Sequence, residues 1–124
     1  YQSEFMNQYQ LHGTYAPCAS YRLLKKAADT AEEMKLNYKV GSVVSGDVFY
    51  SQLPELVWAK MGVLAGEMEC AALYAVAARA GKEALCMCTI SDIIGGDAAN
   101  NLTPEERQSS FDEMIRLALE VADE

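Results

Sequence analysis

The feature that most constrains this fold is a short apolar run over residues 84–92, with the sequence Ala-Leu-Cys-Met-Cys-Thr-Ile-Ser-Asp. The run does not alternate in polarity, which is typical of a central strand buried on both faces of an α/β sheet. It ends in Ser91 and Asp92. Because ligands of open α/β sheets bind beyond the carboxyl ends of the strands, this position predicts that both residues face a binding site. The simpler alternative is that Asp92 caps a turn.

The remaining segments alternate between helical and extended patterns. Hydrophobic periodicity and turn residues predict a strand remnant and loop over residues 1–19, helices over 20–36, 54–60, 70–79 and 104–121, and strands over 37–45 and 63–65. On the last helix we expect a buried face made of Phe111, Met114, Ile115, Leu117, Ala118 and Val121. This order predicts an α/β fold, a three-layer arrangement with helices packed around a mixed, mostly parallel sheet.

Two helix ends carry specific signals. Gly81 is placed to be the C′ glycine of the helix that ends near Arg79. Thr103, Pro104 and Glu106 have the spacing of a capping box with proline as the first helical residue. Arg107 lies in the first turn of that helix, where a cation opposes the helix dipole. We therefore expect a carboxylate or ligand partner for Arg107, the alternative being an arginine exposed to water.

Composition restricts the class of protein. The 124 residues are 51% hydrophobic and 23% charged, as in one ordinary globular domain. The net charge of -8 argues against a nucleic-acid partner, because binding the phosphate backbone needs clustered Lys and Arg. No apolar run has membrane-spanning length and no signal peptide is recognisable, so we expect no membrane partner and a cytoplasmic location.

The four cysteines lie in apolar surroundings and lack the spacing of metal ligands. Together with the single histidine, His12, they give no pattern that predicts a metal site. We interpret them as reduced thiols in a cytosolic core.

Two further groups of side chains suggest a ligand site. Phe49 and Tyr50 follow a predicted strand, where they either cover the end of the core or form a wall on which a flat heterocycle stacks. Glu67 and Glu69 flank Met68 at the end of another predicted strand. Carboxylates near a core are costly unless something donates hydrogen bonds to them. In extended chain the two would point the same way.

Three stretches together resemble the carboxyl-terminal half of the bacterial, hexameric-type purine nucleoside phosphorylases. They are Gly62-Val63-Leu64-Ala65-Gly66-Glu67-Met68-Glu69-Cys70-Ala71-Ala72, Cys88-Thr89-Ile90-Ser91-Asp92, and Glu106-Arg107-Gln108 with Phe111, Met114 and Ile115. The Glu-Met-Glu stretch is shared with uridine phosphorylases and with methylthioadenosine/adenosylhomocysteine nucleosidases, whereas the Ser-Asp strand end followed by Glu-Arg-Gln points to the purine branch. The chain has no initiator Met, and we expect residues 1–124 to be the carboxyl-terminal part of a single α/β domain.

The resemblance implies roles for particular residues at the sugar and the base. Phe49 matches the aromatic that stacks on the purine, with Tyr50 beside it. Met68 and Glu69 match residues that hold the ribose, the Glu69 carboxylate accepting hydrogen bonds from the 2′ and 3′ hydroxyls. Glu67 matches a second acidic residue near the sugar.

The resemblance also implies an acid at the leaving base. Ser91 and Asp92 match the pair at the base edge, and Asp92 matches the acid that protonates purine N7, for which we expect a shielded pocket. Arg107 matches an arginine that reaches this aspartate when its helix shifts during closure. Gly66 stands where a bulkier aliphatic residue is common, which enlarges the expected base pocket.

The implied activity is phosphorolysis of purine nucleosides, with phosphate as co-substrate, no cofactor and a homohexameric assembly. The family's phosphate-binding loop belongs to the amino-terminal half and has no counterpart among these residues. Two alternatives follow: a hydrolytic purine nucleosidase of the same superfamily, and a non-catalytic nucleoside-binding fragment if the chain is complete.

Overall fold

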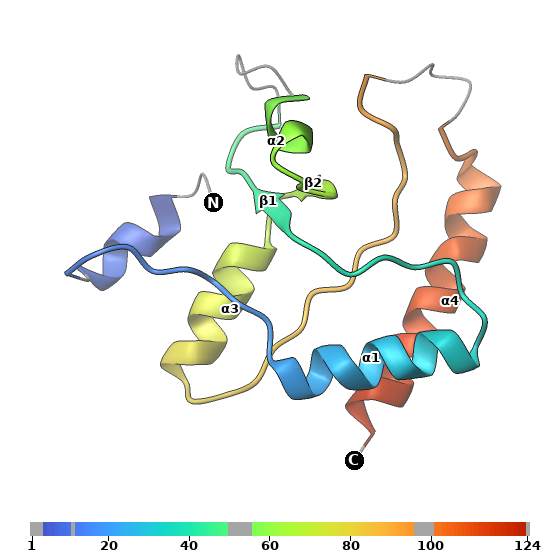
Figure 1. The fold of residues 1–124 in the computed structure, drawn as a ribbon, viewed down its shortest axis with the longest axis horizontal. Coiled ribbons are helices and arrows are strands. Elements are labelled where there is room, and N and C mark those ends of the chain that lie inside the picture. The colour runs from blue at the N-terminus through green and yellow to red at the C-terminus, as the bar shows by residue number, and fades with distance from the viewer. Residues whose placement is uncertain (1–3, 11, 50–55, 96–100, 124) are drawn as a thin grey trace. The chain divides into compact units, whose positions relative to one another are not determined.

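The computed structural model describes residues 4–10, 12–49, 56–95 and 101–123. In chain order its elements are the 3-10 helix η1 (Glu4–Tyr9), α1 (Tyr21–Glu33), β1 (Val43–Ser45), α2 (Leu56–Lys60), β2 (Ala65–Glu67), α3 (Cys70–Arg79) and α4 (Pro104–Ala122) (Figure 1). They fall into two compact units, one formed by Tyr1–Tyr21 and Gly41–Cys86, the other by Arg22–Val40 and Met87–Glu124. Each unit is described by itself below.

The first unit is built on a short parallel sheet. β1 and β2 pair in the register Val43 with Ala65, Val44 with Gly66, and Ser45 with Glu67 (Figure 1). Because the strands are parallel, their carboxyl ends lie at the same edge of the sheet. Helices together with a parallel sheet confirm the α/β class predicted from the sequence.

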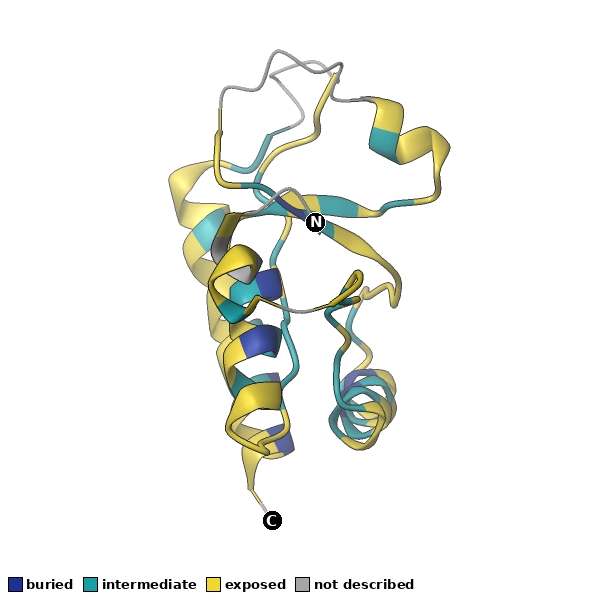
Figure 2. Cartoon of the chain, turned by 90° about the vertical axis from the view of Figure 1, so that its left-hand side faces the viewer, coloured by how far each residue is buried: buried dark blue, intermediate teal, exposed yellow. Residues whose placement is uncertain are grey.

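Small residues of α3 form the core of this unit. The buried residues, dark blue in Figure 2, include Cys70, Ala71 and Ala75 of α3 and Ser45 at the end of β1. Alanine side chains permit a close approach of a helix to its neighbours, at the expense of buried apolar area.

The carboxyl end of α3 is a Schellman motif, as Gly81 predicted. The Lys82 N–H donates to the Ala77 carbonyl at 2.8 Å, and the Gly81 N–H donates to the Ala78 carbonyl at 3.1 Å. Gly81 has a φ of +64°, a conformation that glycine adopts without the penalty of a Cβ atom.

In the second unit a side chain of α1 contacts the carboxyl end of α4. Ala27 and Ala31 of α1 and Leu117 and Val121 of α4 are buried, and the Lys26 ammonium donates to the Val121 carbonyl at 3.1 Å. On α4 the prediction is wrong for Phe111 and Ile115, which are 37% and 49% exposed, because the described neighbours of the helix cover only one side of its apolar surface.

The predicted central strand over residues 84–92 is not formed. The structure assigns no strand to these residues, and Ile90 is 53% exposed. Backbone groups that a ladder would use have other partners: the Cys86 N–H donates to the Tyr74 hydroxyl at 2.9 Å, and the Ser91 carbonyl accepts from the Leu102 N–H at 3.1 Å. The apolar run thus identifies a segment able to form a strand, but strand formation also needs a paired neighbour.

Other element boundaries differ from the sequence predictions. The described part of residues 1–19 contains the 3-10 helix η1 and no strand. β1 takes up only the end of the segment predicted over 37–45, and β2 begins where the strand predicted over 63–65 was expected to end. Each strand is as long as the three register pairs that join it to the other, so pairing rather than propensity sets its length. Residues 54 and 55, the predicted start of α2, lie outside the described residues.

The interpretation of all four cysteines as reduced core thiols is wrong. Cys70 and Cys86 form a disulfide with their Cα atoms 5.9 Å apart, and Cys18 and Cys88 are exposed. Cys70 begins α3 and Cys86 lies in the segment that returns along this helix, so the fold brings them within bonding range although the sequence places them 16 residues apart. Bonded cysteines are also unavailable as thiolate ligands for a metal.

Among the described helices, none combines the length and the apolar character that crossing a membrane requires.

Candidate functional site

One group of predicted site residues follows the carboxyl ends of β1 and β2. Phe49 lies beyond β1, and Met68 and Glu69 lie directly beyond β2. The parallel pairing of Ser45 with Glu67 brings these two strand ends to the same edge of the sheet. This is the location at which α/β proteins bind ligands, and here it arises within a single unit.

Phe49 lies at the surface and does not cover the core. It is 75% exposed, and the neighbouring Val48 is 67% exposed. The core-covering alternative is therefore wrong for Phe49. Its predicted partner Tyr50 lies outside the described residues.

Glu67 is held by three hydrogen bonds. Its Oε1 atom accepts from the Ser45 hydroxyl, while Oε2 accepts from the backbone N–H groups of Glu69 and Cys70, both at 2.6 Å. The N–H groups at the start of a helix lack partners within the helix and carry partial positive charge. The Glu67 carboxylate thus caps α3 from outside the helix, and the expectation that a carboxylate here needs donors is confirmed.

Glu69 differs from Glu67 although the two are only two residues apart. Glu69 is the N-cap residue of α3, with φ of -125° and ψ of -23°, and its side chain makes no capping hydrogen bond. Because β2 ends at Glu67, the chain is not extended through Glu69, and the premise that both carboxylates point the same way does not hold. Within the described part of the chain, the exposed Glu69 carboxylate has no hydrogen-bond donor, which leaves it available to a ligand.

Gly66 and Met68 lie on either side of Glu67. Gly66 is exposed, and a Cβ atom placed on it would lie 3.7 Å from the Val44 Cγ1 atom, an ordinary van der Waals distance. Glycine is therefore not required here by packing within the unit. Met68 is 41% exposed, so a long apolar side chain lies at the surface.

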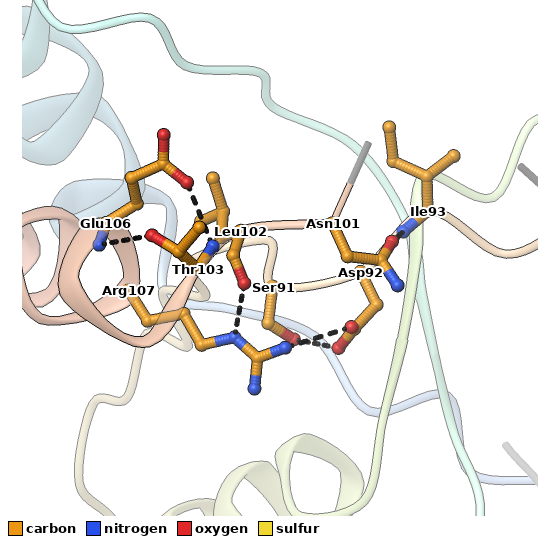
Figure 3. Close-up of polar contacts among 8 residues, drawn as sticks. All are labelled: Ser91, Asp92, Ile93, Asn101, Leu102, Thr103, Glu106 and Arg107. Atoms are coloured by element: carbon orange, nitrogen blue, oxygen red, sulfur yellow. Dashed lines mark hydrogen bonds and ion pairs between the residues drawn. The ribbon is translucent and has the colours of Figure 1, made fainter. Parts of the chain in front are cut away.

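The second group of predicted residues is assembled in the other unit. The Ser91 hydroxyl donates to Asp92 Oδ2 at 2.6 Å, and Arg107 Nη2 donates to Asp92 Oδ1 at 3.2 Å (Figure 3). Both carboxylate oxygens of Asp92 are thus engaged by side chains. The prediction that Arg107 has a carboxylate partner is confirmed, and that partner is Asp92.

The capping box of α4 positions Arg107. Thr103 Oγ1 accepts from the Glu106 N–H at 3.2 Å, and the Glu106 carboxylate accepts from the Thr103 N–H at 2.9 Å (Figure 3). The backbone hydrogen bond from Thr103, together with its side-chain hydrogen bond, lowers the pKa of Glu106 below its ordinary value. With the first turn fixed in this way, Arg107 Nε reaches the Leu102 carbonyl at 3.1 Å and the guanidinium faces Asp92.

Two residues that the sequence interpretation missed close the loop between Asp92 and α4. The Leu102 N–H donates to the Ser91 carbonyl at 3.1 Å. Asn101 Oδ1 accepts from the Ile93 N–H at 3.1 Å (Figure 3). The available signal was Asn101, two residues before the N-cap Thr103, since Asn side chains commonly bond to nearby backbone.

The environment of Asp92 corrects two expectations. The Asp92 and Arg107 side chains are 52% and 41% exposed, so the described residues provide no shielded pocket for the acid. A carboxylate this exposed keeps much of its hydration. In the described part of the chain the Asp92 carboxylate accepts from side chains and not from a backbone N–H, which removes the turn-capping alternative.

Comparison with known proteins identifies similar sequences. The profile of the Phosphorylase superfamily matches residues 2–124. Proteins named purine nucleoside phosphorylase DeoD-type are similar over most of the chain. They include those of Caldanaerobacter subterraneus subsp. tengcongensis (47% identity over 94% of this chain and 51% of the relative), Clostridium perfringens strain SM101 (48%, 94% and 50%) and Geobacillus sp. strain WCH70 (46%, 94% and 50%). The chain spans about half the length of these relatives.

Proposed function

This chain belongs to the phosphorylase superfamily, and on that premise we propose that it supplies the nucleoside-binding part of a purine nucleoside phosphorylase. The reaction is the reversible phosphorolysis of purine ribonucleosides and 2′-deoxyribonucleosides, which gives the free base and ribose or deoxyribose 1-phosphate. The observation that carries the proposal is the cluster in which Ser91 and Arg107 both donate to the Asp92 carboxylate. The names of the similar proteins support the same substrate class.

Asp92 acts as the acid at the leaving base. As a phosphate oxygen attacks C1′, the bond from C1′ to N9 breaks and its electron pair enters the purine ring. Transfer of the Asp92 proton to N7 neutralises the negative charge that develops there. Arg107 and Ser91 then stabilise the carboxylate that remains, because both donate to its oxygens.

The pairing of Arg107 with Asp92 corresponds to the state after proton transfer. The adjacent guanidinium stabilises the carboxylate that remains when Asp92 has given its proton to the base. The 52% exposure of Asp92 gives water access to return a proton between turnovers. The contact is already formed in this structure, so no further shift of α4 is needed to make it.

The sugar and base are held by the residues that follow β1 and β2. Glu69 accepts hydrogen bonds from the 2′ and 3′ hydroxyls with the carboxylate that the described chain leaves without a donor. Phe49, which is 75% exposed, offers a ring face for the purine, and the exposed Met68 contacts the ribose.

Phosphate is the co-substrate in this proposal, and no cofactor takes part. A homohexameric assembly and a cytoplasmic location follow from the same resemblance. They are tested by the mass of the assembly in solution and by cell fractionation.

The decisive experiment measures cleavage of inosine and adenosine by the full-length protein with and without phosphate. We expect release of the base only with phosphate, together with an equal amount of ribose 1-phosphate. Cleavage to free ribose without phosphate would identify a nucleosidase and overturn the proposal. Binding of nucleosides without any cleavage would identify a non-catalytic protein and overturn it as well.

A further inference from the structure

We propose that Ser45 is a positioning residue, which acts through the Glu67 carboxylate to fix the backbone from which Glu69 binds the sugar. The inference rests on the proposed function of Glu69. It also gives Glu67 a role other than direct contact with the ribose.

The parallel register creates this arrangement. Ser45 and Glu67 are the last residues of β1 and β2 and are register partners in the sheet. The Gly46 N–H donates to the Glu67 carbonyl at 3.0 Å, which continues the ladder beyond Ser45. Side chains of paired residues on neighbouring strands lie on the same face, so the hydroxyl and the carboxylate are held within reach of each other.

The Ser45 hydroxyl connects the sheet to α3. It donates to Glu67 Oε1 and accepts from the Ala71 N–H at 2.9 Å. Ser45 is only 5% exposed, and among the described residues it is the one polar residue that is buried. A buried hydroxyl is costly unless its hydrogen-bonding capacity is used, and here it both donates and accepts.

The result is a clamp formed by two side chains on three successive N–H groups. Glu67 Oε2 accepts from Glu69 and Cys70, and Ser45 Oγ accepts from Ala71. Glu69 is the N-cap residue of α3, and Cys70 and Ala71 are its first two residues. The N–H groups at this end of a helix have no acceptor within the helix itself. Since Glu69 has no capping interaction of its own side chain, its backbone is held by Glu67 while its carboxylate stays free for a ligand.

Loss of the Ser45 hydroxyl releases one oxygen of the Glu67 carboxylate and leaves the Ala71 N–H without its acceptor. The carboxylate can then rotate away from the Glu69 N–H, and Glu69 loses its fixed position relative to the sugar. Displacement of a binding group by a fraction of an ångström is enough to weaken contacts that depend on geometry. The free base does not touch Glu69 in this scheme, so its binding is unaffected.

The experiment compares nucleoside and base in the full-length protein carrying Ser45→Ala. We expect the KM for inosine to rise about tenfold, with the inhibition constant of hypoxanthine changed less than about twofold. Ser45→Thr keeps the hydroxyl and is expected to restore most of the lost affinity. Ser42→Ala is the matched control, because Ser42 is an exposed serine one residue before β1.

A second test asks whether Ser45 acts through Glu69. In a Glu69→Ala background, Ser45→Ala is expected to have no further effect on the KM for inosine. If the effects of Ser45→Ala and Glu69→Ala on the KM for inosine are additive, or if Ser45→Ala weakens the binding of inosine and hypoxanthine equally, Ser45 has only a general structural role and the inference is overturned. If Ser45→Ala does not fold, Glu67→Gln tests the same clamp with the same readouts, and an unchanged KM there would also overturn it. Failure of the wild-type protein to cleave inosine refutes the proposed function instead, so the two failures are distinguishable.

Discussion

Replacement of Asp92 by asparagine separates the contribution of this residue to catalysis from its contribution to folding. The amide has nearly the shape of the carboxylate, and its oxygen can still accept a hydrogen bond from Arg107. It cannot give a proton to the purine. We therefore predict that Asp92→Asn leaves folding almost unchanged and removes most of the phosphorolysis.

The structure sets the size of the two effects. The ion pair joins Arg107 Nη2 to Asp92 Oδ1 at 3.2 Å between side chains that are 41% and 52% exposed. Solvent screening limits such a pair to less than about 1 kcal/mol of folding free energy. Loss of a general acid costs about 10²- to 10⁴-fold in rate, which corresponds to about 2.7 to 5.4 kcal/mol of transition-state stabilisation.

The assay measures kcat/KM for inosine and the free energy of unfolding in urea on the same preparations. Asp112→Asn is the control, because Asp112 is an exposed aspartate of α4 and the substitution is chemically identical. A second substrate isolates the proton transfer. 7-Methylinosine already carries a positive charge on the base and needs no proton at N7, so we expect Asp92→Asn to retain most of its rate with that substrate.

Two results would refute this reasoning. An inosine rate within about threefold of wild type would exclude Asp92 as the acid, since it lies far below the effect of a lost general acid. A loss of equal size on inosine and 7-methylinosine would place Asp92 in binding or folding rather than in proton transfer.

Three further predictions concern stability. Thr103→Ala removes the N-cap of α4 and is expected to lower the free energy of unfolding by about 1 kcal/mol, measured in urea against Thr14→Ala, an exposed threonine outside any helix. The pKa of Glu106 is lowered in the folded state, so the ionised Glu106 stabilises the fold above the ordinary Glu pKa, and this stabilisation is lost as the pH falls through the lowered value. When the urea midpoint is measured against pH, Glu106→Gln is expected to flatten this part of the profile. Reduction of the Cys70–Cys86 bond, which joins residues 16 positions apart, is expected to lower the free energy of unfolding by about 3 kcal/mol. The control is a Cys70→Ala variant, whose free energy of unfolding is expected not to change when a dithiol reductant is added.

Local signals in the sequence predicted the helices well. α3 spans the predicted residues and ends in the Schellman motif that Gly81 indicated. α4 begins at the predicted capping box, with Pro104 as its first residue. Helix ends can be predicted because the residues that satisfy their free N–H and carbonyl groups lie within a few positions of each other.

Strands and cysteines were predicted less well because their state depends on residues far away in the sequence. The run over 84–92 has the composition of a buried strand, but its backbone groups bond to the Tyr74 hydroxyl and the Leu102 N–H instead of to a neighbouring strand. Cys70 and Cys86 show no spacing that distinguishes a disulfide from two thiols, and only the return of the chain along α3 brings them together. Whether a segment pairs with another strand, or a cysteine with another cysteine, depends on the fold, and composition shows only that such pairing is possible.

The candidate site illustrates the same distinction between local and long-range information. An arginine in the first turn of a helix is locally unfavourable, and this mismatch correctly predicted that Arg107 has a carboxylate partner. The Glu-Met-Glu stretch, in contrast, presents two equivalent carboxylates in the sequence, and nothing local separates their roles. The separation comes from Ser45 on the neighbouring strand, which holds the Glu67 carboxylate at the start of α3, whereas the Glu69 side chain makes no capping hydrogen bond. The motif alone therefore selects a segment as the candidate site, whereas the different hydrogen bonding of its two carboxylates depends on the register of the sheet.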